Sequence, residues 1–152
     1  MSTYTYAYDA AGRPQSVTGP GAQVVQHAYD GPLVTSTAWS GPFAASVAWT
    51  YDNAFRVATE TVAGTAAIVY AYDADDLLTA AGSLAMGRNA QNGLLTSSTL
   101  GTLVDSYSYN SFGEAAGRTL TASGAPLFAV SYVRDESSRI VQKQETIAGV
   151  SD

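Results

Sequence analysis

The sequence contains no cysteine, one histidine (His27) and one lysine (Lys143), and only 13 % of its 152 residues are charged. The lack of cysteine excludes disulfides and thiolate metal sites, and it leaves the cellular compartment open. The lysine and the arginines form no cluster and the formal net charge is −6. Because nothing in the sequence would neutralise phosphate groups, we expect no nucleic-acid partner.

Long hydrophobic runs are also missing. No apolar stretch approaches the length of a membrane span, and the segment after Met1 lacks the basic and then apolar order of a signal peptide. We therefore expect neither a membrane span nor a signal peptide in this chain. Apolar residues make up 46 %, too many for a disordered chain, and the length allows one domain with a hydrophobic core.

What the sequence does contain is a repeated unit, first seen as Tyr6-Ala7-Tyr8-Asp9-Ala10-Ala11-Gly12-Arg13. It has the pattern of a strand, a tight turn and the start of a second strand. Aspartate at the first turn position can accept a bond from the backbone two residues later, and glycine at the fourth tolerates a positive φ. Seven such turn-opening residues, the anchors, follow one another at 16 to 25 residues: Asp9, Asp30, Asp52, Asp73, Asn89, Asn110 and Asp135.

Side-chain size alternates before each anchor. Large residues lie one position before it (Tyr8, Tyr29, Tyr51, Tyr72, Arg88, Tyr109 and Arg134) and three positions before it (Tyr6, His27, Trp49, Tyr70, Met86, Tyr107 and Tyr132). The residue between them is mostly small, and all ten tyrosines fall at odd offsets. A strand keeps this parity and a helix does not, so the pattern predicts strands with an aromatic column on one face.

The residues after the anchors predict the second strand of each hairpin. Gly12-Arg13, Phe55-Arg56 and Ser138-Arg139 open it in three copies, the turn after Asp30 is one residue short, and the turn after Asn89 carries one extra residue. We predict an all-β fold, a repetitive antiparallel hairpin meander forming a curved or spiralling sheet, as a single domain over residues 1–152. No helix is expected.

The repeats resemble the Rhs/YD-repeat family, named for Tyr-Asp units followed by Gly-Arg. The resemblance rests on Tyr6 to Arg13, Tyr70-Ala71-Tyr72-Asp73, Tyr107-Ser108-Tyr109-Asn110 and Arg134 to Arg139, and it covers nearly the whole chain. The sequence departs from the pattern where arginine replaces tyrosine, at positions 88 and 134, and where asparagine replaces aspartate, at positions 89 and 110. The resemblance implies a β-ribbon that spirals into a large hollow shell, of which seven repeats would form part of the wall, in a secreted or cell-surface parent protein.

Residues that could carry chemistry all have a simpler structural explanation. The tyrosines could stack on sugars, but their repeat positions favour packing. His27 occupies a column otherwise filled by Tyr, Trp and Met, and Asp73-Ala74-Asp75-Asp76 lacks the spacing of an EF-hand. Neither Glu114 nor Glu145 has a partner that suggests acid–base work. We expect no catalytic residue, no cofactor and no metal site.

Two functions remain open, beside a third in which an enzyme is built on the sheet; that one would need a cleft with convergent polar groups, which the sequence does not show. The first is a non-enzymatic wall segment of an Rhs/YD-type shell that encloses a toxin or serves as a cell-surface module. The alternative is an adhesion module that binds carbohydrate or protein through its aromatic face or turns. The first edge, Tyr4-Thr5-Tyr6-Ala7-Tyr8, has no Lys or Pro to prevent pairing, so we expect a dimer or higher oligomer unless the sheet closes or its edges are covered. Both termini look like cuts through a longer array, whose neighbouring repeats would be further partners, or like the ends of one natural short array without caps.

Overall fold

A computed structural model describes residues 2–147 and 150–151 of the chain. It consists of β-strands with one short 3-10 turn, η1, which confirms the predicted all-β class and the hairpin meander. The elements are β1 (Thr5–Tyr8), β2 (Pro14–Thr18), η1 (Pro20–Ala22), β3 (Val24–Asp30), β4 (Leu33–Ser40), β5 (Ala45–Tyr51), β6 (Val57–Val62), β7 (Ile68–Tyr72), β8 (Leu78–Ala81), β9 (Leu84–Arg88), β10 (Leu95–Leu100), β11 (Leu103–Tyr109), β12 (Ala115–Ala122), β13 (Ala125–Arg134), β14 (Ile140–Ile147) and β15 (Val150–Ser151).

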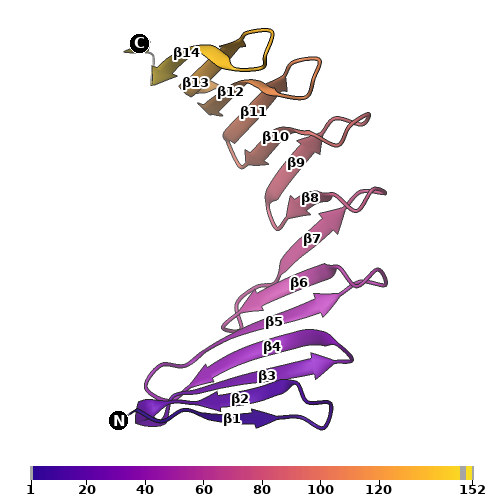
Figure 1. Cartoon of the computed structure of the whole chain (residues 1–152), viewed down its shortest axis with the longest axis vertical. Helices are drawn as coiled ribbons and strands as arrows, with labels where there is room; N and C mark the ends of the chain where they lie inside the picture. Colours follow the sequence, from indigo (N-terminus) through magenta and orange to yellow (C-terminus); the bar gives the residue numbers. More distant parts are fainter. Residues whose placement is uncertain (1, 148–149, 152) are drawn as a thin grey trace. The chain divides into compact units, whose positions relative to one another are not determined.

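The chain divides into two compact units, Met1–Tyr70 and Ala71–Asp152. In the first unit, each strand from β1 to β7 pairs antiparallel with the next along the chain. In the second, the strands from β8 to β15 do the same. Figure 1 shows this succession of hairpins within each unit. Because every strand pairs with its sequence neighbour, the repeats in the sequence become repeats in space.

Every hairpin whose pairing is described beside its anchor turn contains the same β-bulge. In the first, Ala7 pairs with Ser16 and Tyr8 pairs with Pro14, so Gln15 is skipped. The equivalent skipped residues are Thr35, Ala58, Thr96, Ala116 and Val141. A bulge moves the inside–outside alternation by one residue, so the large side chains on both sides of it stay on the same face of the sheet.

The register divides each unit into two chemically different faces, because side chains alternate along a strand and paired residues share a face. The aromatic face carries the large residues: Val25, His27, Tyr29, Val34, Thr37, Trp39, Val47, Trp49 and Tyr51 in the first unit, and Met86, Leu103, Asp105, Tyr107, Tyr109, Arg118, Phe128, Val130 and Tyr132 in the second. The small-residue face carries Gln26, Ala28, Ser36, Ala38, Ser46, Ala48 and Thr50 in the first unit, and Ser97, Ser106, Ser108, Gly117, Thr119, Ala129, Ser131, Gln144 and Thr146 in the second.

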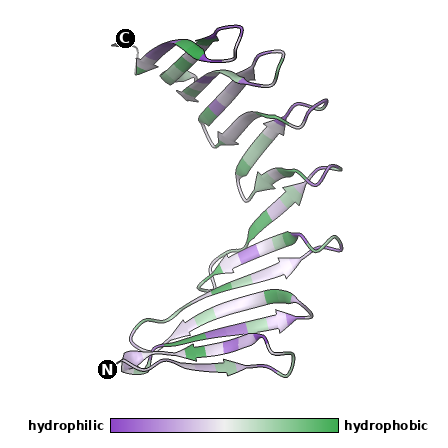
Figure 2. Ribbon diagram, in the orientation of Figure 1, coloured by the Kyte–Doolittle hydropathy of each residue, from purple (hydrophilic) through white to green (hydrophobic). Residues whose placement is uncertain are grey.

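The length of the chain allows a hydrophobic core, but the described residues bury very few side chains. Val130, 7 % exposed, and Thr37, 9 % exposed, are the most buried of them, and no large side chain among them is fully buried. The reason is that the described residues of each unit form a single β-layer, and none of them forms a second sheet or helix over either face. Side chains are covered only by neighbours on their own face. Figure 2 accordingly shows hydrophobic residues spread over the strands of both units.

Candidate functional site

At Asp9, Asp52, Asn110 and Asp135, a side-chain clasp between the anchor and the residue four positions later holds the turn. In the first copy, Asp9 Oδ1 accepts bonds from the N–H groups of Ala11 and Arg13, both at 2.9 Å. Asp9 Oδ2 accepts a bond from Arg13 Nε at 2.7 Å and lies 2.6 Å from Nη2. The backbone adds Gly12 N–H to Asp9 O and Asp9 N–H to Arg13 O, each at 2.9 Å, and Gly12 has φ of 77°. This is a three-residue hairpin loop closed by a left-handed residue.

The same clasp recurs at Asp52 with Arg56 and at Asp135 with Arg139. Hydrogen bonds lower the pKa of all three aspartates, chiefly from the backbone N–H of Arg13 for Asp9 and from the arginine side chains for Asp52 and Asp135. Each bond favours the charged carboxylate, so the clasp is strongest when the aspartate is ionised.

In the Asn110 copy the donor and acceptor of the clasp are exchanged. The residue four positions later is Glu114, and Asn110 Nδ2 donates to Glu114 Oε2 at 2.7 Å. Asn110 Oδ1 still accepts from the N–H groups of Phe112 and Glu114, both at 3.0 Å. The bond from Asn110 is the main cause that lowers the pKa of Glu114. Asparagine therefore replaces aspartate where the partner is itself a carboxylate.

The tyrosine just before the anchor connects each hairpin to the one before it. The hydroxyl of Tyr29 donates to Pro14 O at 2.6 Å, that of Tyr51 to Val34 O at 2.6 Å, and that of Tyr109 to Leu95 O at 2.9 Å. Each acceptor pairs with the residue just before the anchor of the preceding hairpin: Pro14 with Tyr8, Val34 with Tyr29 and Leu95 with Arg88. We call this bond the hairpin stitch. In the first copy the guanidinium of Arg13 also lies over the ring of Tyr29, 4.4 Å from its centroid.

The two arginines that depart from the repeat pattern make the same stitch. Arg88 Nε donates to Leu78 O at 3.0 Å, and Arg134 Nη2 donates to Ala115 O at 3.3 Å. Leu78 and Ala115 start the second strand of the preceding hairpin. A long donor at this position is therefore the shared requirement, and tyrosine and arginine both meet it.

Polar side chains on the aromatic face are bonded to neighbours on that face. His27 Nδ1 lies 2.9 Å from Thr37 Oγ1, and Trp49 Nε1 donates to Glu60 Oε2 at 3.0 Å. In the second unit, Arg118 donates to both oxygens of Asp105 and lies 5.7 Å from the centroid of Tyr107. Hydrogen bonding from Arg118 lowers the pKa of Asp105. These contacts support the structural interpretation of His27 made from the sequence.

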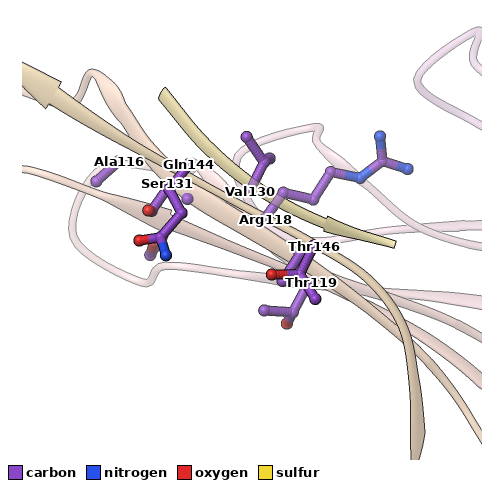
Figure 3. Close-up of a pocket in the computed structure, with 10 residues that line it drawn as sticks. Ala116, Arg118, Thr119, Val130, Ser131, Gln144 and Thr146 are labelled. Atoms are coloured by element: carbon purple, nitrogen blue, oxygen red, sulfur yellow. The ribbon is translucent and has the colours of Figure 1, made fainter. Parts of the chain in front are cut away.

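Each face has a hollow in each unit. On the aromatic face of the first unit the hollow has a volume of about 500 Å³, and its lining includes Tyr29, Trp49 and Tyr51. On the aromatic face of the second unit the hollow has a volume of about 200 Å³, and its lining includes Tyr109, Phe128 and Tyr132. On the small-residue face the volumes are about 400 and 410 Å³. Figure 3 shows the larger of these, with Ser131 and Gln144 on one side of the sheet and Arg118 and Val130 on the other.

The acidic turn at Asp73 follows the anchor pattern. Asp73 Oδ1 accepts from the N–H groups of Asp75 and Leu77, both at 2.9 Å. Within residues 2–147 and 150–151 no group of three or more His, Asp or Glu side chains could hold a metal ion. No helix in the same residues is long and apolar enough to cross a membrane.

The structure places the residues singled out from the sequence in two kinds of position. Tyr6, Tyr8, Tyr29, Trp49, Tyr51, Tyr70, Tyr72, Tyr107, Tyr109 and Tyr132 lie on strands, Asp30 ends β3, and Asp9, Gly12, Arg13, Asp52, Asp73, Asn89, Asn110, Asp135 and Arg139 lie in turns. They meet only in the small sets that form clasps and stitches, and they do not converge on one cleft.

Sequence reasoning missed the stitch, the bulge and the Asn110–Glu114 exchange. The constant four-residue offset of Arg13, Arg56, Glu114 and Arg139 from their anchors was the available signal for the clasp.

No protein-family model matches the chain, and the comparison with curated proteins found no match. Solved structures do match. The crystal structure of TcdB2-TccC3-Cdc42 aligns with 95 % of this chain at 12 % identity and a TM-score of 0.59. The crystal structure of TcdB2-TccC3 without its hypervariable C-terminal region aligns with 93 % at 12 % identity and a TM-score of 0.58. The aligned part is 11 % of each of those chains, so this chain spans a small fraction of their length and shares their fold over that part.

Proposed function

We propose that this chain is a non-enzymatic wall segment of an Rhs/YD-type β-shell, in a secreted or cell-surface protein whose wall encloses cargo such as a toxin. The observation that carries the proposal is the stitch between successive hairpins, repeated in both units. It joins hairpins edge to edge into a sheet that needs no core. The fold shared with the TcdB2-TccC3 chains and the YD pattern of the sequence support it.

A wall has two different surfaces, and the faces of each unit differ in this way. One is lined by aromatic and aliphatic side chains, the other by Ala, Gly, Ser and Thr. Aspartates such as Asp9, Asp52 and Asp135 are engaged in clasps, and we assign no catalytic role to any described residue.

Single cysteines on opposite faces test the enclosing role, because the chain has no cysteine of its own. Leu103→Cys would report on the aromatic face and Thr119→Cys on the small-residue face; both positions are exposed and lie on adjacent strands, β11 and β12. In the isolated chain, both should react with a small maleimide and with a bulky polyethylene-glycol maleimide. In the assembled parent protein, one of the two should react with the small reagent only. Equal reaction of both with the bulky reagent in the assembly would refute enclosure.

A second function, carbohydrate binding, is favoured by one observation. Tyr6 and Tyr8 on β1, and Tyr4 just before it, are 58–60 % exposed, whereas the tyrosines of the inner hairpins are half-buried. Exposed rings in a row can stack on sugar rings. A glycan array probed with the wild-type chain and with Tyr6→Ala would test it: binding that the substitution abolishes supports this function, and an array without hits rejects it.

A further inference from the structure

The two ends of the strand succession carry the two halves of the stitch, each without its counterpart. By its position before the anchor Asp9, Tyr8 is a stitch donor, but residues 2–147 and 150–151 contain no hairpin before it. Its side chain is 60 % exposed, and its hydroxyl makes no hydrogen bond with residues 2–147 or 150–151. Tyr29, Tyr51 and Tyr109, which do make the stitch, are half-buried.

The last hairpin presents the acceptor side. Ile140 starts β14, as Pro14 starts β2, and no side chain of the described residues donates to its carbonyl. Arg139 corresponds to Arg13, which lies over the Tyr29 ring of the next hairpin. The Arg139 side chain is 78 % exposed, against 33 % for Arg13. The last hairpin thus offers a guanidinium and a carbonyl in the positions that would receive another tyrosine.

The backbone register between hairpins is the same throughout both units. The residue four positions before an anchor pairs with a fixed position on the preceding hairpin, one residue after its bulge, as in Gln26 with Ser16 and Ser131 with Gly117. The same rule holds for Ala48 with Ser36, Val69 with Thr59 and Ser106 with Ser97. Applied to the two ends, it places Thr5 opposite Gln142. Among the described residues β15 pairs with Thr146 and Ile147, and none of them pairs with Gln142 on the β14 edge that faces away from β13.

We propose that β1 of one copy pairs antiparallel with β14 of a second copy, with Thr5 opposite Gln142. The Tyr8 hydroxyl of one copy then donates to the Ile140 carbonyl of the other, and its ring lies under the Arg139 guanidinium. A second copy is the partner that this chain itself specifies, because its last hairpin carries the groups that the first hairpin lacks. The pairing is head to tail and leaves both outer ends open, so it builds a series of oligomers. It requires only the repeat geometry and can occur whether or not the chain encloses cargo.

Directed disulfide formation tests the partner and the register together. Thr5→Cys and Gln142→Cys chains are mixed and oxidised; residues directly opposite in a ladder are close enough for a disulfide, and diagonal neighbours are not. We expect a cross-linked dimer in the mixture, and little with Thr5→Cys mixed with Gln144→Cys. Dimers of Thr5→Cys alone, at the level of the mixture, would show symmetric edge pairing and overturn the proposal.

Light scattering over a concentration series tests the stitch. The wild-type chain should show a mass that rises with concentration, and a single hydrogen bond predicts that Tyr8→Phe weakens association about three- to tenfold. Tyr6→Phe is the matched control, since Tyr6 lies on the same strand, is 58 % exposed and is not at the stitch position. A wild-type monomer at every concentration would overturn the proposal, as would equal effects of the two substitutions.

Discussion

The aspartate of the clasp makes four bonds with one short side chain. In the Asp9 copy, one carboxylate oxygen orders the turn backbone and the other binds the Arg13 side chain. At Asn89 and Asn110 the side-chain Oδ1 accepts the same bonds from the turn backbone, and there is no second carboxylate oxygen to bind an arginine. The two tasks of the anchor can therefore be separated by substitution.

Asp9→Asn should reduce the pH dependence of stability. The folded pKa of Asp9 is lowered, so its ionised form stabilises the fold above the unfolded pKa of about 4, and this contribution is lost as pH falls through the folded value. Asparagine keeps the Oδ1 acceptor and loses the charge. We expect a lower melting temperature at neutral pH and a smaller further drop between neutral and acidic pH than in the wild type. An unchanged slope of melting temperature against pH would contradict this.

Asn110→Asp should have the opposite pH dependence. It would place a carboxylate against Glu114, with which Asn110 Nδ2 now bonds at 2.7 Å. Two neighbouring carboxylates disfavour each other's charge and raise a pKa, so the variant should be destabilised at neutral pH and recover part of its stability as the pH falls toward 5. Asn89→Asp is the control, because the residue opposite this anchor is Leu94, which has no carboxylate to repel the new charge. Thermal melts of both variants at several pH values decide the matter.

Phe55→Gly should stabilise the fold. Phe55 occupies the left-handed turn position with φ of 61°, where the first and sixth copies have Gly12 and Gly113. A left-handed conformation costs a non-glycine residue roughly 1 kcal/mol, and Phe55 is 72 % exposed, so little packing is lost. Phe112→Gly is the matched control: Phe112 is 85 % exposed in an equivalent loop without a positive φ. Denaturant melts should show a gain of about 1 kcal/mol for the first substitution only.

At the scale of the element, the hairpin is the unit that repeats, and its second strand is adjusted to keep one face aromatic. The bulges at Gln15, Thr35, Ala58, Thr96, Ala116 and Val141 restore the alternation after each turn. Small residues on the other face allow strands to lie close: a Cβ added at Gly117 would meet Ser108 Oγ and Val130 O, each at 3.0 Å. The stitch then adds a bond between neighbouring hairpins on the aromatic face.

Arg88→Tyr should be tolerated far better than Arg88→Leu. A tyrosine at this position would reach the Leu78 carbonyl as Tyr29, Tyr51 and Tyr109 reach theirs, whereas leucine leaves that bond unmade. Because the net contribution of such a bond is about 1 kcal/mol, Arg88→Leu should lose roughly this amount of unfolding free energy. Tyrosine cannot replace the second bond of Arg88, to Gly93 O, so a small loss is expected there too. Equal losses in urea titrations would argue against the equivalence of the two residues.

At the scale of the whole molecule, the stability of the described residues comes from ladders, clasps and stitches between neighbours, without a common core. Contacts run from each hairpin to the next along the chain, as in solenoid proteins. Such chains are stabilised by the sum of nearest-neighbour interfaces, so the end hairpins have one neighbour each and are expected to be the least stable.

The heat-capacity change on unfolding should be small for the chain length. A globular protein of this size would show roughly 2 kcal/mol/K, at 12–15 cal/mol/K per residue, because unfolding exposes a buried apolar core. Here many large hydrophobic residues are already exposed, among them Phe43, Leu100, Leu103, Val141 and Ile147. We expect a clearly lower value and a broad transition by scanning calorimetry. A sharp transition with the globular value would mean that these surfaces are covered in solution.

The sequence by itself determined the strands, their order and the placement of each turn. Strand parity is visible in the alternation of Tyr6, Ala7 and Tyr8, and a turn residue such as Gly12 acts through its own backbone. The short turn at Asp30 and the long one at Asn89 were readable for the same reason: they change the count of residues between strands.

Only the tertiary structure decided which groups meet across hairpins and whether a core exists. The equivalence of Tyr51 and Arg88 depends on a backbone carbonyl in the preceding hairpin, and no sequence pattern marks a carbonyl. The bulge depends on the register between two strands, and the alternation of side chains within one strand carries no information about that register. The chain is long enough for a core and 46 % of its residues are apolar, but burial needs a second layer, and within the described residues each unit is a single layer.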